Sequence, residues 1–162
     1  MDDSTVIEQG TGESADGRHT LRFVVRLPHS MEEVWTAVAT PDGLVGWLAA
    51  ADTLQPRLGG AVALRRLNGA SPAVPGRITA WDVERVAEYT MEGFHGRIRF
   101  HLEPGTILRF THEIEGDDSL RVDCLAAWHD HFERLAAALD GRPTDWSSWT
   151  PERFQELRES YG

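Results

Sequence analysis

The chain has 162 residues, the length of one ordinary domain, which can bury a full core without disulfides or structural metals. Its 26 acidic and 16 basic residues give a formal net charge of -10, which repels phosphate backbones and anionic lipid headgroups. Nucleic-acid and membrane partners are therefore not expected. The single cysteine, Cys124, excludes an intrachain disulfide and a cysteine cluster for zinc.

The beginning of the chain, MDDSTVIEQG, has acidic residues where a secretory signal would carry positive charge, and no apolar segment follows. We therefore expect a cytoplasmic protein. Residues 1–18 are polar and rich in glycine apart from Val6 and Ile7. This composition predicts a mobile tail, with a short extended piece from Thr5 to Gln9.

The first regular elements are expected from His19 onward. Between His19 and Leu27 apolar residues alternate with other residues, which predicts a strand with one buried face. Ser30 and Glu33 then form a capping box, with Ser30 as the N-cap of a short helix over residues 31–39.

A second short helix is expected after Thr40, because Thr40 can cap it and Pro41 suits the first helical position. Turn residues rich in Gly and Pro then divide the chain up to Glu115 into an antiparallel meander. The expected strands cover residues 61–67, 77–85, 87–92, 97–103 and 106–115. In the last two, apolar and polar residues alternate strictly, so each has one covered face and one face exposed to water.

The clearest periodicity in the chain predicts a long helix from Asp118 to Gly141. Its apolar residues follow one another at steps of three and four, on one stripe of the helix: Leu125, Trp128, Phe132, Leu135 and Leu139. Asp117 or Asp118 supplies the N-cap, and Gly141 lies where a helix commonly ends. The economical architecture is an α+β domain with this helix laid on a curved antiparallel sheet.

The pattern of elements carries a family resemblance. The run LPHSMEEVWTAVATPDGLVGW, the meander, and THEI leading into AAWHDHFERLAAALDG resemble the helix-grip (SRPBCC) superfamily of START and Bet v 1 proteins. The resemblance covers Leu21 to Gly141 and is strongest to a bacterial single-domain group related to the C-terminal domain of the Hsp90 ATPase activator (AHSA1-like). It implies a curved sheet wrapped around the long helix, with a cavity between them that opens near the two short helices.

The expected organisation follows from this resemblance and from the end of the sequence. A mobile tail over residues 1–18 precedes a helix-grip domain over 19–141. Residues 142–162 form an extension, in which Thr150 and Pro151 open a short last helix. Because its tryptophans and other apolar residues are too many for a free tail, we expect the extension to pack on the body.

No sequence motif for a nucleophile or a phosphate-binding loop is present, and no cofactor is expected. His129 and Glu133 share one helical face at a spacing of four residues, but His131 points away from His129. We therefore predict no metal site and interpret this run as a solvated helix surface.

Two titratable residues are expected on the covered face of the sheet. His112 alternates with apolar residues, so it is either a core histidine bonded to a backbone carbonyl or a polar group that lines a pocket. Tyr89 and Met91 lie on the inward face of their strand, because Glu88 and Glu92 occupy the other face.

A site for a small hydrophobic molecule, such as a lipid, a polyketide or an aromatic compound, is the favoured interpretation. The predicted ligand-binding residues are Trp47, Leu64, Tyr89, Met91, Phe100, Phe110, His112, Leu125 and Trp128. The corresponding function is a non-enzymatic carrier or sensor, as a monomer or a homodimer. One alternative is a cyclase-like or hydrolytic enzyme with His112 and Tyr89 as acid and base. Another is a protein-interaction or co-chaperone-like module that docks through the acidic surface or the Trp-rich extension.

Overall fold

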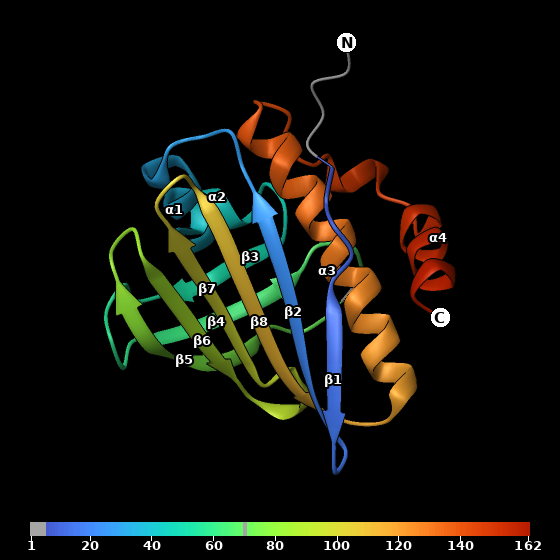
Figure 1. Cartoon of the computed structure of the whole chain (residues 1–162). Helices are drawn as coiled ribbons and strands as arrows, with labels where there is room; N and C mark the ends of the chain where they lie inside the picture. Colours follow the sequence, from blue (N-terminus) through green and yellow to red (C-terminus); the bar gives the residue numbers. More distant parts are fainter. Residues whose placement is uncertain (1–5, 70) are drawn as a thin grey trace.

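The computed structural model describes residues 6–69 and 71–162. It contains one antiparallel eight-stranded sheet of order β1-β2-β8-β7-β6-β5-β4-β3, which curves beside the long helix α3 (Figure 1). Two short helices, α1 and α2, lie between the second and third strands, at one end of the sheet. This arrangement confirms the prediction of an α+β helix-grip fold.

Eight strands replace the approximately six that the sequence predicts. They are β1 Thr11–Ala15, β2 Arg18–Arg26, β3 Ala49–Leu54, β4 Ala61–Arg66, β5 Val74–Asp82, β6 Val86–Met91, β7 Arg97–Glu103 and β8 Ile107–Glu115. Both strands that were not predicted, β1 and β3, lie at the edges of the sheet. Each pairs with one neighbour only, so neither needs a strongly apolar pattern to form.

Strand β1 corrects the expectation that residues 1–18 form a tail. Its sequence TGESA lacks alternation, and four of its five residues are exposed, so backbone pairing with β2 rather than side-chain burial holds it in place. Ile7 is only 5% exposed and anchors the segment before β1 in the core. Residues 6–10 have no regular structure. Residues 1–5 lie outside the described part of the chain, and with them the beginning of the expected extended piece.

The two short helices begin at the predicted caps. In α1, Met31–Ala39, the Ser30 Oγ accepts a hydrogen bond from the backbone N–H of Glu33 at 3.1 Å and donates to the Glu33 carboxylate at 3.2 Å. In α2, Pro41–Leu44, the Thr40 Oγ1 accepts from the Gly43 N–H at 3.0 Å. A Cβ at Gly43 would lie 2.0 Å from the carbonyl oxygen of Thr36, so only glycine lets α2 pack this closely on α1.

The long helix α3, Asp118–Leu139, connects the sheet to the C-terminal extension. One side of it packs on β1, β2 and α1, and the other side packs on α4, Glu152–Tyr161, which Figure 1 shows on the side of α3 away from the sheet. Leu157 of α4 is buried at 5% exposure. The hydroxyl of Tyr161 accepts from the Gly10 N–H at 2.8 Å and is hydrogen-bonded to His129 at 2.8 Å. Tyr161 therefore joins α4, α3 and the segment before β1.

Removal of the N-cap of α3 is expected to destabilise the protein by about 1 kcal/mol. The Asp117 carboxylate accepts from the Leu120 N–H at 2.9 Å, which satisfies one of the free amides of the first turn. We expect Asp117→Ala to show this loss in urea denaturation, whereas Asp117→Asn, which keeps an acceptor oxygen, changes stability by only a few tenths of a kcal/mol. Equal stability of the alanine variant and the unmodified protein would contradict the capping role.

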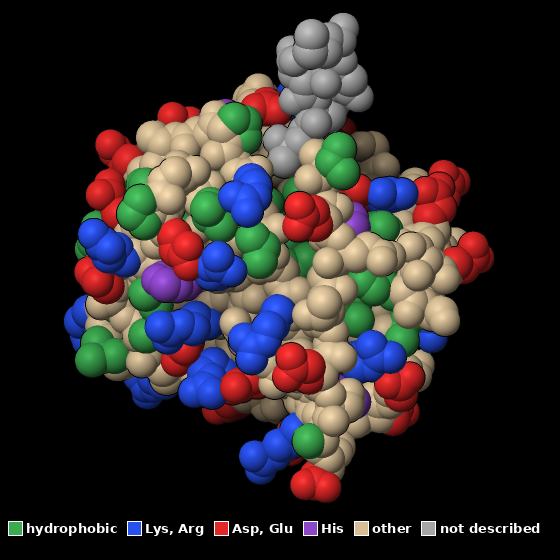
Figure 2. Space-filling model, in the orientation of Figure 1, with side chains coloured by type: hydrophobic (Ala, Val, Ile, Leu, Met, Phe, Trp, Pro, Cys, Tyr) green, Lys and Arg blue, Asp and Glu red, His purple; other side chains and the backbone are tan. Residues whose placement is uncertain are grey.

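The outward face of the sheet is charged, as the strict alternation of β7 and β8 predicts. Arg97 pairs with Glu113 across these strands, and the Arg99 Nη1 lies 2.9 Å from a carboxylate oxygen of Glu88 on β6. On the side of the molecule shown in Figure 2, basic and acidic side chains are interleaved rather than separated into patches. This face therefore combines solvent exposure with local charge neutralisation.

Candidate functional site

The predicted ligand-binding residues come together in one hydrophobic core between the sheet and α3. Leu64 is less buried than the other predicted residues. It is half-buried and packs against the core. The others are at most 7% exposed: Trp47, Tyr89, Met91, Phe100, Phe110, His112, Leu125 and Trp128. The sequence thus identifies the inward-facing residues, whereas their role in ligand binding stays a prediction.

Aromatic rings from both sides occupy the space where an enclosed cavity was expected. Phe110 lies 4.3 Å from Trp128 and 5.0 Å from Phe132 between ring centroids, and Phe100 lies 5.3 Å from Phe110. The Trp47 ring, which is fully buried, stacks at 6.0 Å from Phe132. These separations are those of packed aromatic pairs. Two pockets of the described structure lie elsewhere, and neither corresponds to the expected cavity open near α1 and α2.

The polar atoms of two core aromatics are bound to the end of α1. The Trp47 Nε1–H donates to the carbonyl oxygen of Ala37 and the Tyr89 hydroxyl donates to that of Val38, each at 2.8 Å. The last carbonyls of a helix lack partners within the helix, so these side chains satisfy them. Burial raises the pKa of Tyr89 well above its ordinary value of 10.0, which keeps the phenol protonated as a donor.

His112 is held between an indole and a backbone carbonyl. The Trp128 Nε1–H donates to His112 Nδ1 at 2.8 Å, and His112 Nε2 is hydrogen-bonded to the carbonyl oxygen of His95. Because an indole N–H can only donate, Nδ1 is the acceptor and the ring proton is on Nε2, which donates to His95. Burial lowers the pKa of His112 to about 4. This hydrogen bond to a backbone carbonyl is the one predicted for a core histidine.

The position of the His95 carbonyl, which accepts the hydrogen bond from His112, depends on the turn before β7. The short helix η1, Gly93–His95, ends at Gly96, whose φ of 56° is in the left-handed region. A Cβ at Gly96 would lie 1.9 Å from the carbonyl oxygen of Glu113 on β8. Glycine therefore allows η1 to approach β8 closely enough for His95 to reach His112.

The enzyme hypothesis required His112 and Tyr89 to act together as acid and base. Their polar atoms instead bind separate internal partners, at Trp128 and His95 for the histidine and at Val38 for the tyrosine. With one pKa lowered and the other raised, both groups are neutral at physiological pH. The arrangement gives a rigid, internally satisfied core rather than a pair of groups directed at a substrate.

One end of the inner face is covered less completely than the rest. Ala51, Leu64 and Val74 form a row across β3, β4 and β5 in the sheet register, and all three are half-buried. The neighbouring row on the inner face is closed toward β6, since Val62 on β4 is 2% and Met91 on β6 is 5% exposed, and only its β3 member, Leu54, is half-buried. The half-buried row therefore forms an apolar margin of the core that solvent still reaches.

The histidines of α3 are used in packing contacts. His129 Nδ1 is hydrogen-bonded to Tyr161, and His131 Nδ1 to the carbonyl oxygen of Trp47 at 2.9 Å, in agreement with the prediction that the two side chains point apart. Glu133 is held by two nitrogens of Arg153, at 2.6 and 2.7 Å. Among residues 6–69 and 71–162, no group of three or more His, Cys, Asp and Glu side chains could hold a metal ion.

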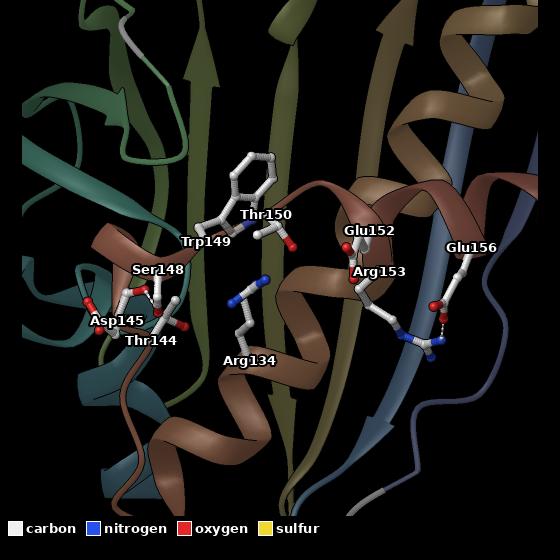
Figure 3. Close-up of a pocket in the computed structure, with 9 residues that line it drawn as sticks. All are labelled: Arg134, Thr144, Asp145, Ser148, Trp149, Thr150, Glu152, Arg153 and Glu156. Atoms are coloured by element: carbon white, nitrogen blue, oxygen red, sulfur yellow. Dashed lines mark hydrogen bonds and ion pairs between the residues drawn. The ribbon is translucent and has the colours of Figure 1, made fainter.

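A groove of about 320 Å³ lies outside the core, between α3 and the C-terminal extension (Figure 3). Its lining residues are Arg134, Thr144, Asp145, Ser148, Trp149, Thr150, Glu152, Arg153 and Glu156. The short helix η2, Trp146–Ser148, forms part of its wall. A second pocket, of about 200 Å³, lies among the ion pairs on the outward face of the sheet. None of the predicted ligand-binding residues lines either one.

The sequence matches one protein family. The model of the family described as activator of Hsp90 ATPase homolog 1-like protein matches residues 28–140. No curated protein is similar enough in sequence to match the chain. Among residues 6–69 and 71–162, no helix is both long and apolar enough to cross a membrane.

Several solved structures share the fold. CalU16 from Micromonospora echinospora, in its solution structure, has a TM-score of 0.69 and 17% identity, covering 99% of this chain and 96% of its own. The conserved protein of unknown function EF2215 from Enterococcus faecalis has a TM-score of 0.68 and 18% identity, with 94% and 88% covered. The Aha1 dimer from Colwellia psychrerythraea has a TM-score of 0.62 and 19% identity, with 74% and 95% covered. At these identities the likeness shows the fold alone.

Proposed function

We infer the function from one premise: the chain belongs to the family of activator of Hsp90 ATPase homolog 1-like proteins. Its fold is that of a ligand-binding or interaction domain in general. We propose that it is a non-enzymatic carrier or sensor that binds a small hydrophobic molecule at the half-buried margin of Ala51, Leu64 and Val74. The molecule is a lipid, a polyketide or an aromatic compound.

The observation that carries this proposal is the difference between the two rows of the inner face. Val62 and Met91 are buried and leave no surface for a ligand, whereas Ala51, Leu64 and Val74 are all half-buried and present apolar side chains beside the core. A ligand that covers this margin would remove apolar surface from water, which contributes about 25 cal/mol of favourable free energy per Å² of buried apolar surface. The polar groups of the core are bound to one another, so the proposal includes no chemical step.

A charge introduced at Leu64 is expected to weaken binding of a hydrophobic molecule. We expect the uncharged fluorescent probe N-phenyl-1-naphthylamine to bind the unmodified protein and to be displaced by dodecanol. Leu64→Glu should weaken binding of this probe by about tenfold or more, because a carboxylate at the margin loses hydration when an apolar molecule covers it. Fluorescence titration measures the affinity.

The matched control is Leu58→Glu, which places the same charge at a leucine that is 68% exposed. This variant should bind the probe as the unmodified protein does. Circular dichroism should show that both variants are folded. The proposal is wrong if the probe does not bind the unmodified protein, or if Leu64→Glu binds it with unchanged affinity.

Self-association is a second candidate property. One of the structures with this fold is described as a dimer, and the sequence leaves monomer and homodimer open. Light scattering coupled to size-exclusion chromatography distinguishes the two states directly, since the masses differ by a factor of two.

A further inference from the structure

We propose that the groove between α3 and the C-terminal extension is a second binding site, which takes a small molecule bearing a carboxylate. This site is independent of the hydrophobic margin, because none of its lining residues belongs to the core. Apart from Arg134, the residues that line it follow residue 140, where the match to the family model ends. The groove is thus a feature of the extension of this chain.

The first observation is a hydrogen-bond donor without an acceptor. The Trp149 Nε1–H is buried, and no partner for it exists among the described residues. The other two tryptophans near the ends of α2 and η2 are satisfied, since Trp47 donates to Ala37 and Trp146 donates to the carbonyl oxygen of Val45 at 2.7 Å. A buried donor that lacks an acceptor is unfavourable, so an acceptor oxygen in the groove would be stabilising.

The second observation is a guanidinium with unused donors. Arg134 is bound to Asp130 through Nε alone, at 3.4 Å from each carboxylate oxygen, and no hydrogen bond of its two Nη groups occurs among the described residues. Its Cζ lies 5.7 Å from the ring centroid of Trp146, within the range of a cation–π contact that holds the guanidinium beside the indole ring. Figure 3 shows this group pointing toward the edge of Trp149 that carries the indole nitrogen.

The other cation of the groove, Arg153, already donates hydrogen bonds to carboxylates from all three of its guanidinium nitrogens. Arg153 donates through Nε and Nη2 to Glu133 and through Nη1 to Glu156 at 3.0 Å. These ion pairs raise the pKa of Arg153 and hold α4 on α3. Arg153 is therefore structural, and Arg134 is the cation that a ligand can approach.

The donors together define the class of ligand. A guanidinium and an indole N–H that converge from two sides match the two oxygens of a carboxylate, with the hydroxyls of Thr144 and Thr150 also lining the groove. Glu152 lines the same groove and has no ion-pair partner among the described residues. Its charge disfavours a dianion such as phosphate and favours a carboxylate that carries an ammonium group nearby. The site is thus suited to a small zwitterion of the amino-acid type.

The test is a titration followed by the indole N–H signals in ¹H–¹⁵N NMR spectra of the full chain, with glycine, acetate and inorganic phosphate as probes at constant ionic strength. The Trp149 signal is identified by its absence in Trp149→Phe. We expect this signal to shift with saturation on addition of glycine, less strongly with acetate, and not with phosphate. Arg134→Gln should weaken glycine binding by about tenfold, because one charge-assisted contact is lost.

Arg142→Gln is the matched control, since it removes the same charge from a residue of the extension that is 68% exposed in its side chain and lies outside the groove. Glycine binding to this variant should be unchanged. No saturable shift of the Trp149 signal with glycine would overturn the proposal, as would equal binding by Arg134→Gln and the unmodified protein. A phosphate response equal to that of glycine would overturn the assignment to a carboxylate. None of these outcomes depends on binding at the hydrophobic margin.

Discussion

Replacement of Phe132 by alanine is expected to lower the free energy of unfolding by about 3 to 5 kcal/mol. Phe132 is fully buried, and its ring lies at centroid distances of 5.1 Å from Phe23, 5.0 Å from Phe110 and 5.7 Å from Trp128. It also stacks on Trp47, so one side chain of α3 contacts the sheet and the segment after α2. Its removal leaves a cavity that these rigid rings cannot close.

Denaturation by urea, followed by circular dichroism, measures this loss. The control is Val83→Ala, a truncation at a residue that is 62% exposed, which should change stability by at most about 0.5 kcal/mol. Since small domains are stable by only about 5 to 15 kcal/mol, the Phe132 variant should be close to unfolding at moderate temperature. A loss below about 1 kcal/mol would show that the aromatic cluster is less closely packed than the ring distances indicate.

The stability of the protein is expected to fall between about pH 6.5 and pH 4 because of His112. Burial lowers the pKa of His112 from its ordinary 6.5 to about 4 in the folded state. In this pH range the unfolded chain binds a proton that the folded chain does not, so acidification favours unfolding. The contribution of His112 to the free energy of unfolding is fully present above pH 6.5 and is lost as the pH falls toward 4. A shift of this size corresponds to about 3 kcal/mol.

The measurement is the free energy of unfolding as a function of pH for the unmodified protein and for His112→Gln. Glutamine keeps one donor and one acceptor but does not titrate, so the slope between pH 6.5 and 4 should be smaller in this variant. Part of the slope should persist, because burial also lowers the pKa of His129 and His131. Identical slopes for both proteins would contradict the buried neutral state of His112. The control His101→Gln, on the outward face of β7, should keep the full slope.

The inward face of the domain could be predicted because alternation in a strand and the step of three to four residues in a helix are local properties. His112 and Trp128 were both assigned to covered faces on this basis. Their hydrogen bond follows from a further requirement, since a buried indole N–H needs an acceptor. Which acceptor the Trp128 N–H reaches depends on how α3 is positioned along β8, and the sequence pattern contains no information on that position.

The groove was not predicted, although the extension was expected to pack on the body. In the sequence Arg134 and Arg153 are equivalent charged residues on helix surfaces. Arg153 pairs with Glu156 on its own helix, and only the position of α4 beside α3 adds the Glu133 carboxylate and leaves the Nη groups of Arg134 without a partner among the described residues. Strands β1 and β3 were not predicted for a related reason. Edge strands are held by backbone hydrogen bonds, and their side chains need not show the alternating pattern by which a strand is predicted.

The sequence by itself predicted the main helices and strands, the helix caps at Ser30, at Thr40 and at Asp117 or Asp118, and the set of side chains that face the core. Each of these depends on residues within a few positions of one another, where spacing and hydrogen-bonding chemistry act directly. The tertiary structure alone decided which aromatic rings pack against one another in the core, and that the groove has unused donors. Both outcomes depend on how side chains from distant segments fit together, because packing and pairing are settled by distances in space and not by spacing along the chain.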